Sequence, residues 1–408
     1  MPRVAVTGMA ALTPIGSDWP TVAAALRDKR TGIRRMDAWA EYEGLNSRLG
    51  APVSDFVRPE HYPRKAIRSM GRVSLLATRA SELALERAGL LNDPILASGH
   101  VGVSYGSSSG TPEALGDFAL MQSRKSTAGL NATSYIRMMP HTCAVNLCVF
   151  FQLKGRVITT CSACTSGSQG IGYAFETVRA GKQIAMIAGG AEELSPTQAA
   201  VFDTLYATST RNDEPDKTPR PFDVARDGLV VGEGAATLVL EDMDHARARG
   251  ATIYAELVGY GTNADGAHVT QPEQQTMQVC MELALSDAGV AASEIGYVSA
   301  HGTATERGDI AESHATAKVY GSRVPISALK SFTGHTLGAC GAIEAWALIE
   351  MMREGWFHPT ANLSEVDPRC AQLDYIVGQM RPISCELAAS NNFAFGGINT
   401  SLVFKVPS

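Results

Sequence analysis

Short apolar runs alternate with longer amphipathic segments along this chain of 408 residues, and that alternation most limits the folds open to it. Val4 to Thr7 and residues 100–105 are mostly apolar, as expected for strands buried on both faces. Between them, apolar side chains recur at helical spacing from Val73 to Ala84, and Gly89 follows where a helix should end. Strands and helices in this order predict a layered α/β fold.

The second half of the chain repeats this order. An apolar helical pattern from Met277 to Leu285 ends at Gly289, and a strand is expected over 297–300. Ala-Gly-Leu at 88–90 and Ala-Gly-Val at 288–290 therefore occupy equivalent points. We expect two similar halves, residues 1–250 and 251–408, linked through the charged stretch 241–249. Further strands are expected at 156–160, 183–188 and 324–329.

The chain has few charges and many glycines. Charged residues make up 19% of it, against about 25% in a typical domain, which favours a large interior and an oligomer interface. The 39 glycines cluster beside Ser, Thr, His and Cys, where they allow tight turns or close approach of the backbone to a ligand. A net charge of −6 argues against bulk nucleic-acid binding.

The sequence also bears on the cellular compartment. No apolar run reaches the roughly 18 residues of a membrane span. Residues 1–16 carry a short apolar run with no A-x-A cleavage site after it, so they are interpreted as a first buried strand rather than a signal peptide. Eight cysteines, mostly in apolar surroundings, predict reduced thiols in the cytoplasm.

The segment from Thr159 to Gly167 follows a predicted strand and opens a helix. Cys164 would lie at or near the N-terminus of that helix, where free N–H groups and the dipole favour a thiolate, so a nucleophile is predicted. The alternatives are a small buried cysteine and a redox pair with Cys161, because the two have C-x-x-C spacing. No second such pair exists for zinc, and the preceding strand is expected to turn Cys161 into the core.

A second segment with candidate chemistry begins at His301, directly after a predicted strand. Catalytic groups gather at strand ends in α/β folds. The histidine is followed by a glycine and by two hydroxyls, Thr303 and Thr305, which suit an extended polar ligand. A histidine satisfied within a turn is the alternative.

A third segment runs from Lys330 through His335 to Glu344. The helix expected over 339–352 is apolar on nearly all sides, so Glu344 should be buried and needs a partner such as Lys330 or a bound cation. His335, in a glycine-rich turn, is a second candidate hydrogen-bond donor. A purely structural role for the three residues is the alternative.

The last segment lies near the C-terminus. Gly396 and Gly397 can expose N–H groups that stabilise an oxyanion, and Phe395 before them can act as a hinged gate. A plain β-turn is the alternative. Together, a thiolate, an oxyanion hole, two neutral imidazoles and a long slot fit acyl transfer with carbon–carbon bond formation.

With these motifs the chain resembles the elongating type of β-ketoacyl-acyl-carrier-protein synthase, a condensing enzyme of the thiolase superfamily. The matching stretches, in family order, are TTCSACTSGSQGIG (159–172), AGGAEE (188–193), residues 208–241, AHGTATERGD (300–309), KSFTGHTLGACGAIEA (330–345) and NNFAFGGIN (391–399). A priming-type enzyme would show Cys–His–Asn, and a thiolase a second catalytic cysteine near the C-terminus; neither pattern is seen. The resemblance implies a thiolase-like five-layered αβαβα fold of two similar halves, and a homodimer.

The resemblance also implies a role for each candidate residue. Cys164 would take an acyl chain from acyl-carrier protein, and the amides of Cys164 and Phe395 would form the oxyanion hole. His301 and His335 would hold the malonyl thioester carbonyl and stabilise the enolate formed as CO₂ leaves. Because both imidazoles then act as N–H donors, Cys164 would depend mainly on the helix dipole for its reactivity. The other implied roles are support of the histidine pair by Lys330, Glu344 and Asp309, and pantetheine binding by Thr303 and Thr305.

A basic cluster at Arg64, Lys65, Arg68 and Arg72 stands out on the acidic chain. It is interpreted either as a solvated helix face or, as the resemblance implies, as a dock for acidic acyl-carrier protein.

Two departures from the family pattern bear on chain length rather than on the reaction. Ile398 stands where the family usually has threonine, and Ser107, Ser108 and Ser109 stand where elongating members often have a branched aliphatic residue or glycine lining the acyl pocket.

The implied reaction is a decarboxylative Claisen condensation in fatty-acid elongation. It needs no cofactor beyond the phosphopantetheine that the substrate carries on its carrier protein. The alternatives are the same condensation in a specialised polyketide or aryl-polyene pathway, and a non-catalytic chain-length partner subunit, which typically lacks the nucleophile.

Overall fold

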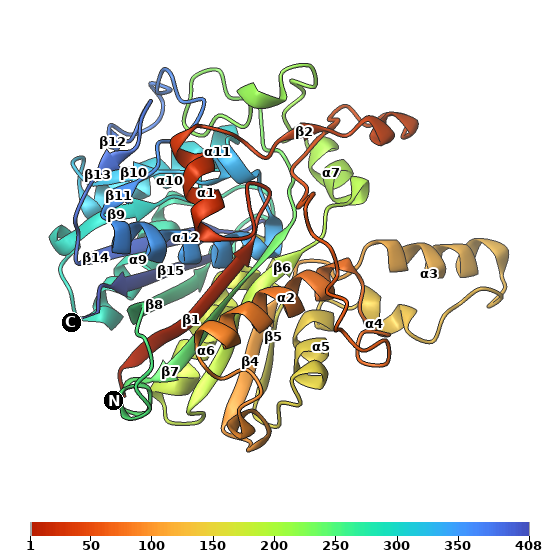
Figure 1. Ribbon diagram of the computed structural model, residues 1–408. Coiled ribbons are helices and arrows are strands. Elements are labelled where there is room, and N and C mark those ends of the chain that lie inside the picture. Colours follow the sequence, from red (N-terminus) through yellow and green to blue (C-terminus); the bar gives the residue numbers. More distant parts are fainter. Residues whose placement is uncertain (1, 408) are drawn as a thin grey trace.

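The strands form two sets with the same internal order in the computed structural model, which describes residues 2–407 (Figure 1). The sets are β5-β4-β6-β7-β1 and β10-β9-β14-β15-β8, with the short strand β12 at the outer edge. In each set the first three strands are mutually parallel, and each of the last two runs antiparallel to its neighbours. The two halves predicted from the sequence therefore share the same strand order and strand directions.

The bounds of these strands follow the chain in order. The first set comprises β1 (Val4–Leu12), β4 (Val101–Gly106), β5 (Val157–Thr160), β6 (Ala185–Glu192) and β7 (Gly234–Asp242). The second comprises β8 (Ala255–Ala264), β9 (Ile295–Ser299), β10 (Pro325–Ser327), β14 (Leu387–Phe393) and β15 (Ile398–Lys405), with β12 at Asp374–Tyr375. The two sets meet where Val4, Ala5 and Val6 pair with Leu257, Glu256 and Ala255.

Helices cover both sets and fill the space between them. The middle layer is α6 (Ser166–Arg179) and α12 (Cys340–Glu354); α6 contacts β4, β6, β8 and β15, and α12 contacts β6, β7 and β14. The outer layers are α2 (Arg72–Arg87) with α5 (Thr142–Phe150), and α9 (Gln274–Ala288) with α10 (Glu306–Tyr320). Five layers built from two similar halves confirm the predicted αβαβα fold class.

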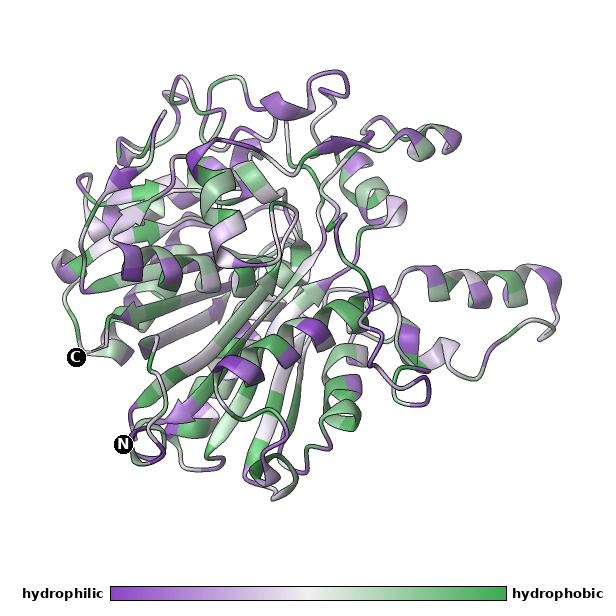
Figure 2. Cartoon of the chain, in the orientation of Figure 1, coloured by the Kyte–Doolittle hydropathy of each residue, from purple (hydrophilic) through white to green (hydrophobic). Residues whose placement is uncertain are grey.

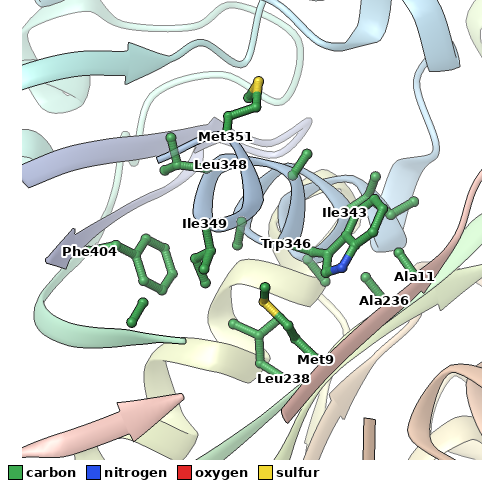
Figure 3. Packing of buried hydrophobic residues seen from close by; sticks show 14 of the residues in the cluster. Met9, Ala11, Ala236, Leu238, Ile343, Trp346, Leu348, Ile349, Met351 and Phe404 are labelled. Atoms are coloured by element: carbon green, nitrogen blue, oxygen red, sulfur yellow. The ribbon is translucent and has the colours of Figure 1, made fainter. Parts of the chain in front are cut away.

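The helix α12 is the centre of the hydrophobic core (Figure 3). Trp346 and Ile349 are buried and belong to the same cluster as Met9, Leu238 and Phe404 from the strands on either side. Figure 2 shows that hydrophobic residues concentrate along the central strands. Because α12 is buried on nearly every side, any polar residue in it must find its partner inside the protein.

The repeat extends to individual glycines. Gly8 on β1 lies so close to α2 that a Cβ there would be 2.2 Å from the Ala84 carbonyl oxygen. Gly259 on β8 stands in the same relation to α9, where a Cβ would be 2.3 Å from the Ala284 oxygen. Both outer helices are followed by a glycine with φ of +68°, Gly89 and Gly289. These positions account for part of the glycine surplus.

Some predicted bounds differ from the structure. The strand expected at 183–188 is β6, and it continues to Glu192. Gly189 and Gly190 allow this, because a side chain at either position would clash with neighbouring backbone. The strand expected at 324–329 ends at Ser327, and Lys330 begins the short helix α11 (Lys330–Thr333). The charged stretch 241–249 forms the end of β7 and the helix α8 (Met243–Ala248).

The remaining elements surround this framework. They are α1 (Trp19–Arg27), α3 (Glu113–Arg124), α4 (Ser134–Met138), α7 (Pro196–Asp203), β2 (Arg34–Arg35), β3 (Leu49–Gly50), β11 (Trp356–Phe357) and β13 (Arg381–Pro382). Figure 1 shows α3 projecting away from the layers as an arm. In the described part of the chain, no helix is both long enough and apolar enough to span a membrane.

We predict that Gly259→Ala lowers the free energy of unfolding by about 1–3 kcal/mol, because β8 and α9 must move apart to admit the methyl group. Gly116→Ala on α3 is the matched control, since nothing lies within 4 Å of a Cβ there. The control should be neutral or stabilising by about 1 kcal/mol. Urea denaturation of both variants measures the difference, and equal midpoints would contradict the close contact.

Candidate active site

Cys164 lies in a tight turn between β5 and α6. The turn spans Ala163–Thr165, and Ala163 adopts a left-handed φ of +49° that directs the chain sharply into the helix. The predicted place near a helix N-terminus is therefore correct, and the side chain is almost fully buried. Burial raises the pKa of the Cys164 thiol, while the backbone N–H groups of Phe395 and Cys164 and the charge of Lys330 lower it in part. Burial thus outweighs the favourable N–H groups that the sequence pointed to.

The two histidines face each other next to this thiol. Their ring centroids are 5.3 Å apart at an angle of 86°, and His335 Nε2 lies 3.1 Å from Cys164 Sγ. The N–H of Leu337 donates to His335 Nδ1 over 3.2 Å. Lys330 Nζ donates to His301 Nδ1 over 3.0 Å. Because each Nδ1 accepts a hydrogen bond, each Nε2 carries the proton and acts as a donor.

Both imidazoles are held in the neutral form. Burial lowers the pKa of His301 and of His335 well below the ordinary value, and the positive charge of Lys330 lowers both further. Two neutral rings, each with its proton fixed on Nε2, can both donate a hydrogen bond to a developing negative charge.

Lys330 is the centre of a buried polar cluster behind His301. Its ammonium donates to Glu344 Oε1 over 2.5 Å and to the His301 carbonyl over 2.6 Å. The second oxygen of Glu344 accepts from Asn392 Nδ2 over 2.6 Å. Burial opposes the charge on Lys330, but the acidic groups of Cys340 and Glu344 outweigh it and hold the pKa above its ordinary value. The sequence predicted either Lys330 or a bound cation as the partner of Glu344, and the structure pairs Glu344 with Lys330.

Two acidic residues hold the loop that carries His301. Glu312 accepts from the N–H groups of His301 and Gly302, at 2.6 and 2.7 Å. Asp309 accepts from Ala304 N at 3.1 Å and from Phe222 N at 2.7 Å. Burial raises the pKa of Glu312 to about 8 and that of Asp309 to about 6. Asp309 thus supports the backbone of this loop and does not contact the histidine ring.

The sequence did not single out Glu312 or Asn392. Glu312 lies on α10, the helix that directly follows the His301 loop, and its carboxylate reaches back to the start of that loop. Asn392 sits within the recognised NNFAFGGIN stretch, but its bond to Glu344 joins β14 to α12 and leaves no local signal. Its spacing of three residues from Asp309, which puts both carboxylates on the same buried face of α10, would have been the available clue for Glu312.

A cavity of about 500 Å³ leads to Cys164 from the surface. His301, His335, Thr303, Thr305 and Phe395 all line it, so the structure brings these predicted residues together. The hydroxyls of Thr303 and Thr305 bond to each other over 2.8 Å. The Phe395 ring meets Phe202 edge-on at 6.1 Å, and Gly396 and Gly397 follow with φ of +94° and +75°.

The donor set near Cys164 does not fit a metal ion. Cys164, His301 and His335 place ligand atoms within 4.8 Å of one another. A metal at Nε2 would need the proton on Nδ1, but Leu337 N–H and Lys330 already donate to those atoms. Lys330 also lies against His301 and Glu344, two members of a second group of possible ligands. A monovalent cation near Glu344 stays a prediction.

The expected placement of Cys161 is wrong. Cys161 is exposed, and its Sγ faces the Ser108 carbonyl at 3.5 Å. The strand β5 ends at Thr160, so the alternation of strand side chains does not extend to position 161. All eight cysteines are free, and Cys164 is the one that lines the cavity with both histidines.

The basic cluster divides into two parts. Arg64, Lys65 and Arg68 are exposed. Arg72 instead donates to Glu233 at 2.7 and 2.9 Å and to the Val53 carbonyl at 3.0 Å. Its guanidinium is committed within the fold, so Arg72 belongs to the N-terminus of α2 rather than to a free basic surface.

This geometry defines a class of protein: a buried thiol, two donor histidines and an access cavity, built at the junction of two thiolase-like halves. The chain belongs to the beta-ketoacyl synthase family. Residues 1–246 match the family's N-terminal domain and residues 254–364 its C-terminal domain.

Similar proteins cover the whole chain. The 3-oxoacyl-(acyl-carrier-protein) synthase 2 of Vibrio harveyi is 37% identical, over 99% of this chain and 98% of that protein. The 3-oxoacyl-(acyl-carrier-protein) synthase 1 of Escherichia coli is 35% identical, over 99% of each chain. A solved beta-ketoacyl synthase from Burkholderia phymatum is 59% identical with a TM-score of 0.99, covering 100% of both chains.

We predict that both histidines stay neutral at pH 6.5, and that Lys330→Met raises the pKa of each, because it removes the charge that lowers them. The pKa values should move towards the ordinary value in the variant, while burial continues to lower them. NMR titration of isotope-labelled histidine measures the shifts, with Lys318→Met as an exposed lysine control. Titration of either ring at or above pH 6.5 in the unmodified protein would contradict this account.

Proposed function

We propose that this protein catalyses the decarboxylative Claisen condensation of malonyl-acyl-carrier protein with an acyl group held on Cys164. The observation that carries the proposal is the arrangement of His301 and His335, both fixed as Nε2–H donors, beside the buried thiol. The relatives named 3-oxoacyl-(acyl-carrier-protein) synthase, at 33–38% identity over 99% of the chain, support this reaction.

In the first half-reaction the Cys164 sulfur attacks the carbonyl of an acyl thioester. The carbon–sulfur bond to phosphopantetheine breaks, and the thiol proton of Cys164 ends on the departing pantetheine sulfur. The backbone N–H groups of Cys164 and Phe395 stabilise the oxyanion of the tetrahedral intermediate. This role is supported by their effect on the Cys164 thiol, whose pKa they lower because they point towards its sulfur. Thr303 and Thr305 bind the pantetheine arm in the cavity, and Phe395 gates it.

In the second half-reaction the malonyl group loses CO₂. The electron pair of the broken carbon–carbon bond forms an enolate, whose oxygen accepts hydrogen bonds from His301 and His335. The enolate carbon then attacks the acyl carbonyl on Cys164, and the cysteine sulfur leaves. Lys330, Glu344 and Asn392 act as positioning residues, because they reach the reacting atoms only through His301.

The pathway that the relatives support is fatty-acid chain elongation. The same fold also occurs in a solved structure described as the ishigamide ketosynthase/chain length factor, which is 30% identical with a TM-score of 0.91. Cys164 speaks against a role as a non-catalytic partner subunit. The reaction needs no cofactor, since the substrate brings the phosphopantetheine. Eight free cysteines support action in the reducing cytoplasm.

Two macromolecular partners belong to this proposal. Arg64, Lys65 and Arg68 form the dock for acidic acyl-carrier protein, and a solved relative 29% identical to this chain is described as a ketosynthase in complex with its acyl-carrier protein. A homodimer is supported by β5, which among residues 2–407 pairs only with β4 and so ends the sheet. Apolar side chains are exposed beside it and on the α3–α4 arm: Val149, Val157, Leu115, Leu120 and Tyr135. The two halves, residues 1–250 and 251–408, are proposed as its domains.

We predict that Cys164→Ala lowers condensation by about 10⁴-fold or more, because the acyl group loses its attachment point. Cys161→Ala is the matched control and should mostly retain activity, since its exposed sulfur faces a carbonyl outside the cavity. The measurement is release of β-ketoacyl product from acyl- and malonyl-carrier protein. An equal loss of condensation activity in the two variants would instead support a redox pair of Cys161 and Cys164.

We predict that His301→Ala and His335→Ala slow malonyl decarboxylation by about 10²–10³-fold each, the scale of a lost oxyanion donor. Acylation of Cys164, followed by mass spectrometry, should fall less, because the oxyanion hole is made of backbone amides. His358→Ala is the control, a buried histidine outside the cavity lining. Acylation lost ahead of decarboxylation would reverse the assigned roles.

A further inference from the structure

Arg307 lines the access cavity, and the proposed reaction assigns it no role. Its side chain is exposed, and it lies in the first turn of α10. Among residues 2–407 its guanidinium has neither an ion-pair partner nor a hydrogen-bond partner, since the neighbouring acid Glu306 pairs with Arg369 instead. A positive charge in the first turn of a helix opposes the helix dipole. The stability of α10 therefore does not explain this arginine.

Two arginines line the cavity, and Arg307 is the one whose charge is available. The side chain of Arg226 is 2% exposed and pairs with Asp309 and Asp367 at 3.6 and 2.6 Å. Arg226 also donates to the Glu306 carbonyl over 3.2 Å, which fixes the backbone next to Arg307. The acidic residues of the lining all accept hydrogen bonds from other protein groups: Asp227, Asp265, Glu306 and Glu312.

The loop that leads from His301 to Arg307 runs from the inside of the cavity to its mouth. His301 is buried, Thr303 and Thr305 are half-buried, and Arg307 is exposed. The start of α10 packs closely against the two threonines: a Cβ on Gly308 would lie 2.5 Å from Thr305 Oγ1 and 3.2 Å from Thr303 Oγ1. Arg307 thus stands at the outer end of the row of residues that lines this wall of the cavity.

We propose that the Arg307 guanidinium binds the phosphate group through which the pantetheine arm is joined to its carrier protein. The inference rests on the proposed function, in which Thr303 and Thr305 bind the arm and its thioester reaches Cys164. The phosphate is the charged group of that arm. With the sulfur at Cys164, the phosphate lies at the opposite, outer end of the arm, near the mouth of the cavity.

The reach and the chemistry both fit this assignment. His301 and Arg307 are six residues apart, so they lie at most about 20 Å from each other, and an extended arm of about a dozen bonds has a similar reach. A guanidinium is planar and can donate two parallel hydrogen bonds to the oxygens of one phosphate. Because the backbone beside Arg307 is already fixed, less conformational freedom is lost when the phosphate binds.

The test measures acylation of Cys164 without a carrier protein, so that charges on the carrier's surface play no part. The two donors are hexanoyl-pantetheine and the methyl ester of hexanoyl-phosphopantetheine, which carries the single negative charge of the carrier-bound arm. The full-length protein should reach half its maximal acylation rate at about a tenfold lower concentration of the phosphorylated donor. High salt should reduce that difference. The maximal rates should be similar, because the phosphate is remote from the reacting carbonyl.

Three variants assign the effect to one side chain. Arg307→Met should remove the difference between the two donors, and Arg307→Glu should reverse it, because the carboxylate repels the phosphate. A glutamate in the first turn of a helix is favourable, so this second variant keeps the fold. Arg323→Met is the matched control and should keep the full difference. Arg323 is exposed three residues beyond the other end of α10 and is outside the cavity lining.

The outcomes separate this inference from the proposed function. Equal use of the two donors by the unmodified protein, or a difference that persists in both Arg307 variants, overturns the inference. It is also overturned if Arg307→Met impairs only carrier-bound donors, since Arg307 would then pair with an acidic residue of the carrier protein. Absence of any adduct on Cys164 with hexanoyl-carrier protein would count against the proposed function instead.

Discussion

The interaction on which the site depends is the buried ion pair between Lys330 and Glu344. An ammonium group removed from water is costly by several kcal/mol unless it is paired and hydrogen-bonded. Here Nζ lies within hydrogen-bond distance of the Glu344 carboxylate, the His301 carbonyl and the His301 ring. With these groups in place, Lys330 keeps its charge in the core. That charge fixes the protonated nitrogen of one histidine and lowers the pKa of both.

The ion pair lies beside Cys164 because the two halves, which share one strand order, meet at the N-terminal ends of the middle helices α6 and α12. Cys164 follows β5, and Lys330 and His335 follow β10, the strand in the same position of the second set. The N-terminal ends of α6 and α12 approach closely through glycines: a Cβ on Gly167 would lie 2.9 Å from the Gly338 carbonyl oxygen. Absence of side chains at this junction lets groups of the two halves share one cavity, as strand ends do in other α/β folds.

Much of the fold and of the site could be predicted from local pattern. The strand-end positions of Cys164, His301 and Lys330 followed from apolar runs that stop at polar residues, and burial of Glu344 followed from the apolar faces of its helix. The placement of Cys161 was wrong because strand alternation was extended one residue past the end of β5. Arg72 looked free because its partner Glu233 is distant in sequence, and Asn392 was missed for the same reason.

The sequence by itself determined the residue types of the chemistry, a layered α/β fold and its repeat in two halves, because each can be recognised in short-range periodicity and spacing. The five-layered αβαβα class followed from the family resemblance. Only the tertiary structure decided which nitrogen of each imidazole bears the proton, since that depends on Leu337 N–H and Lys330 Nζ approaching Nδ1. It also decided that burial raises the thiol pKa of Cys164 despite the favourable helix end. Hydrogen-bond direction and desolvation arise from contacts between distant segments, and such contacts exist only once the two halves have packed together.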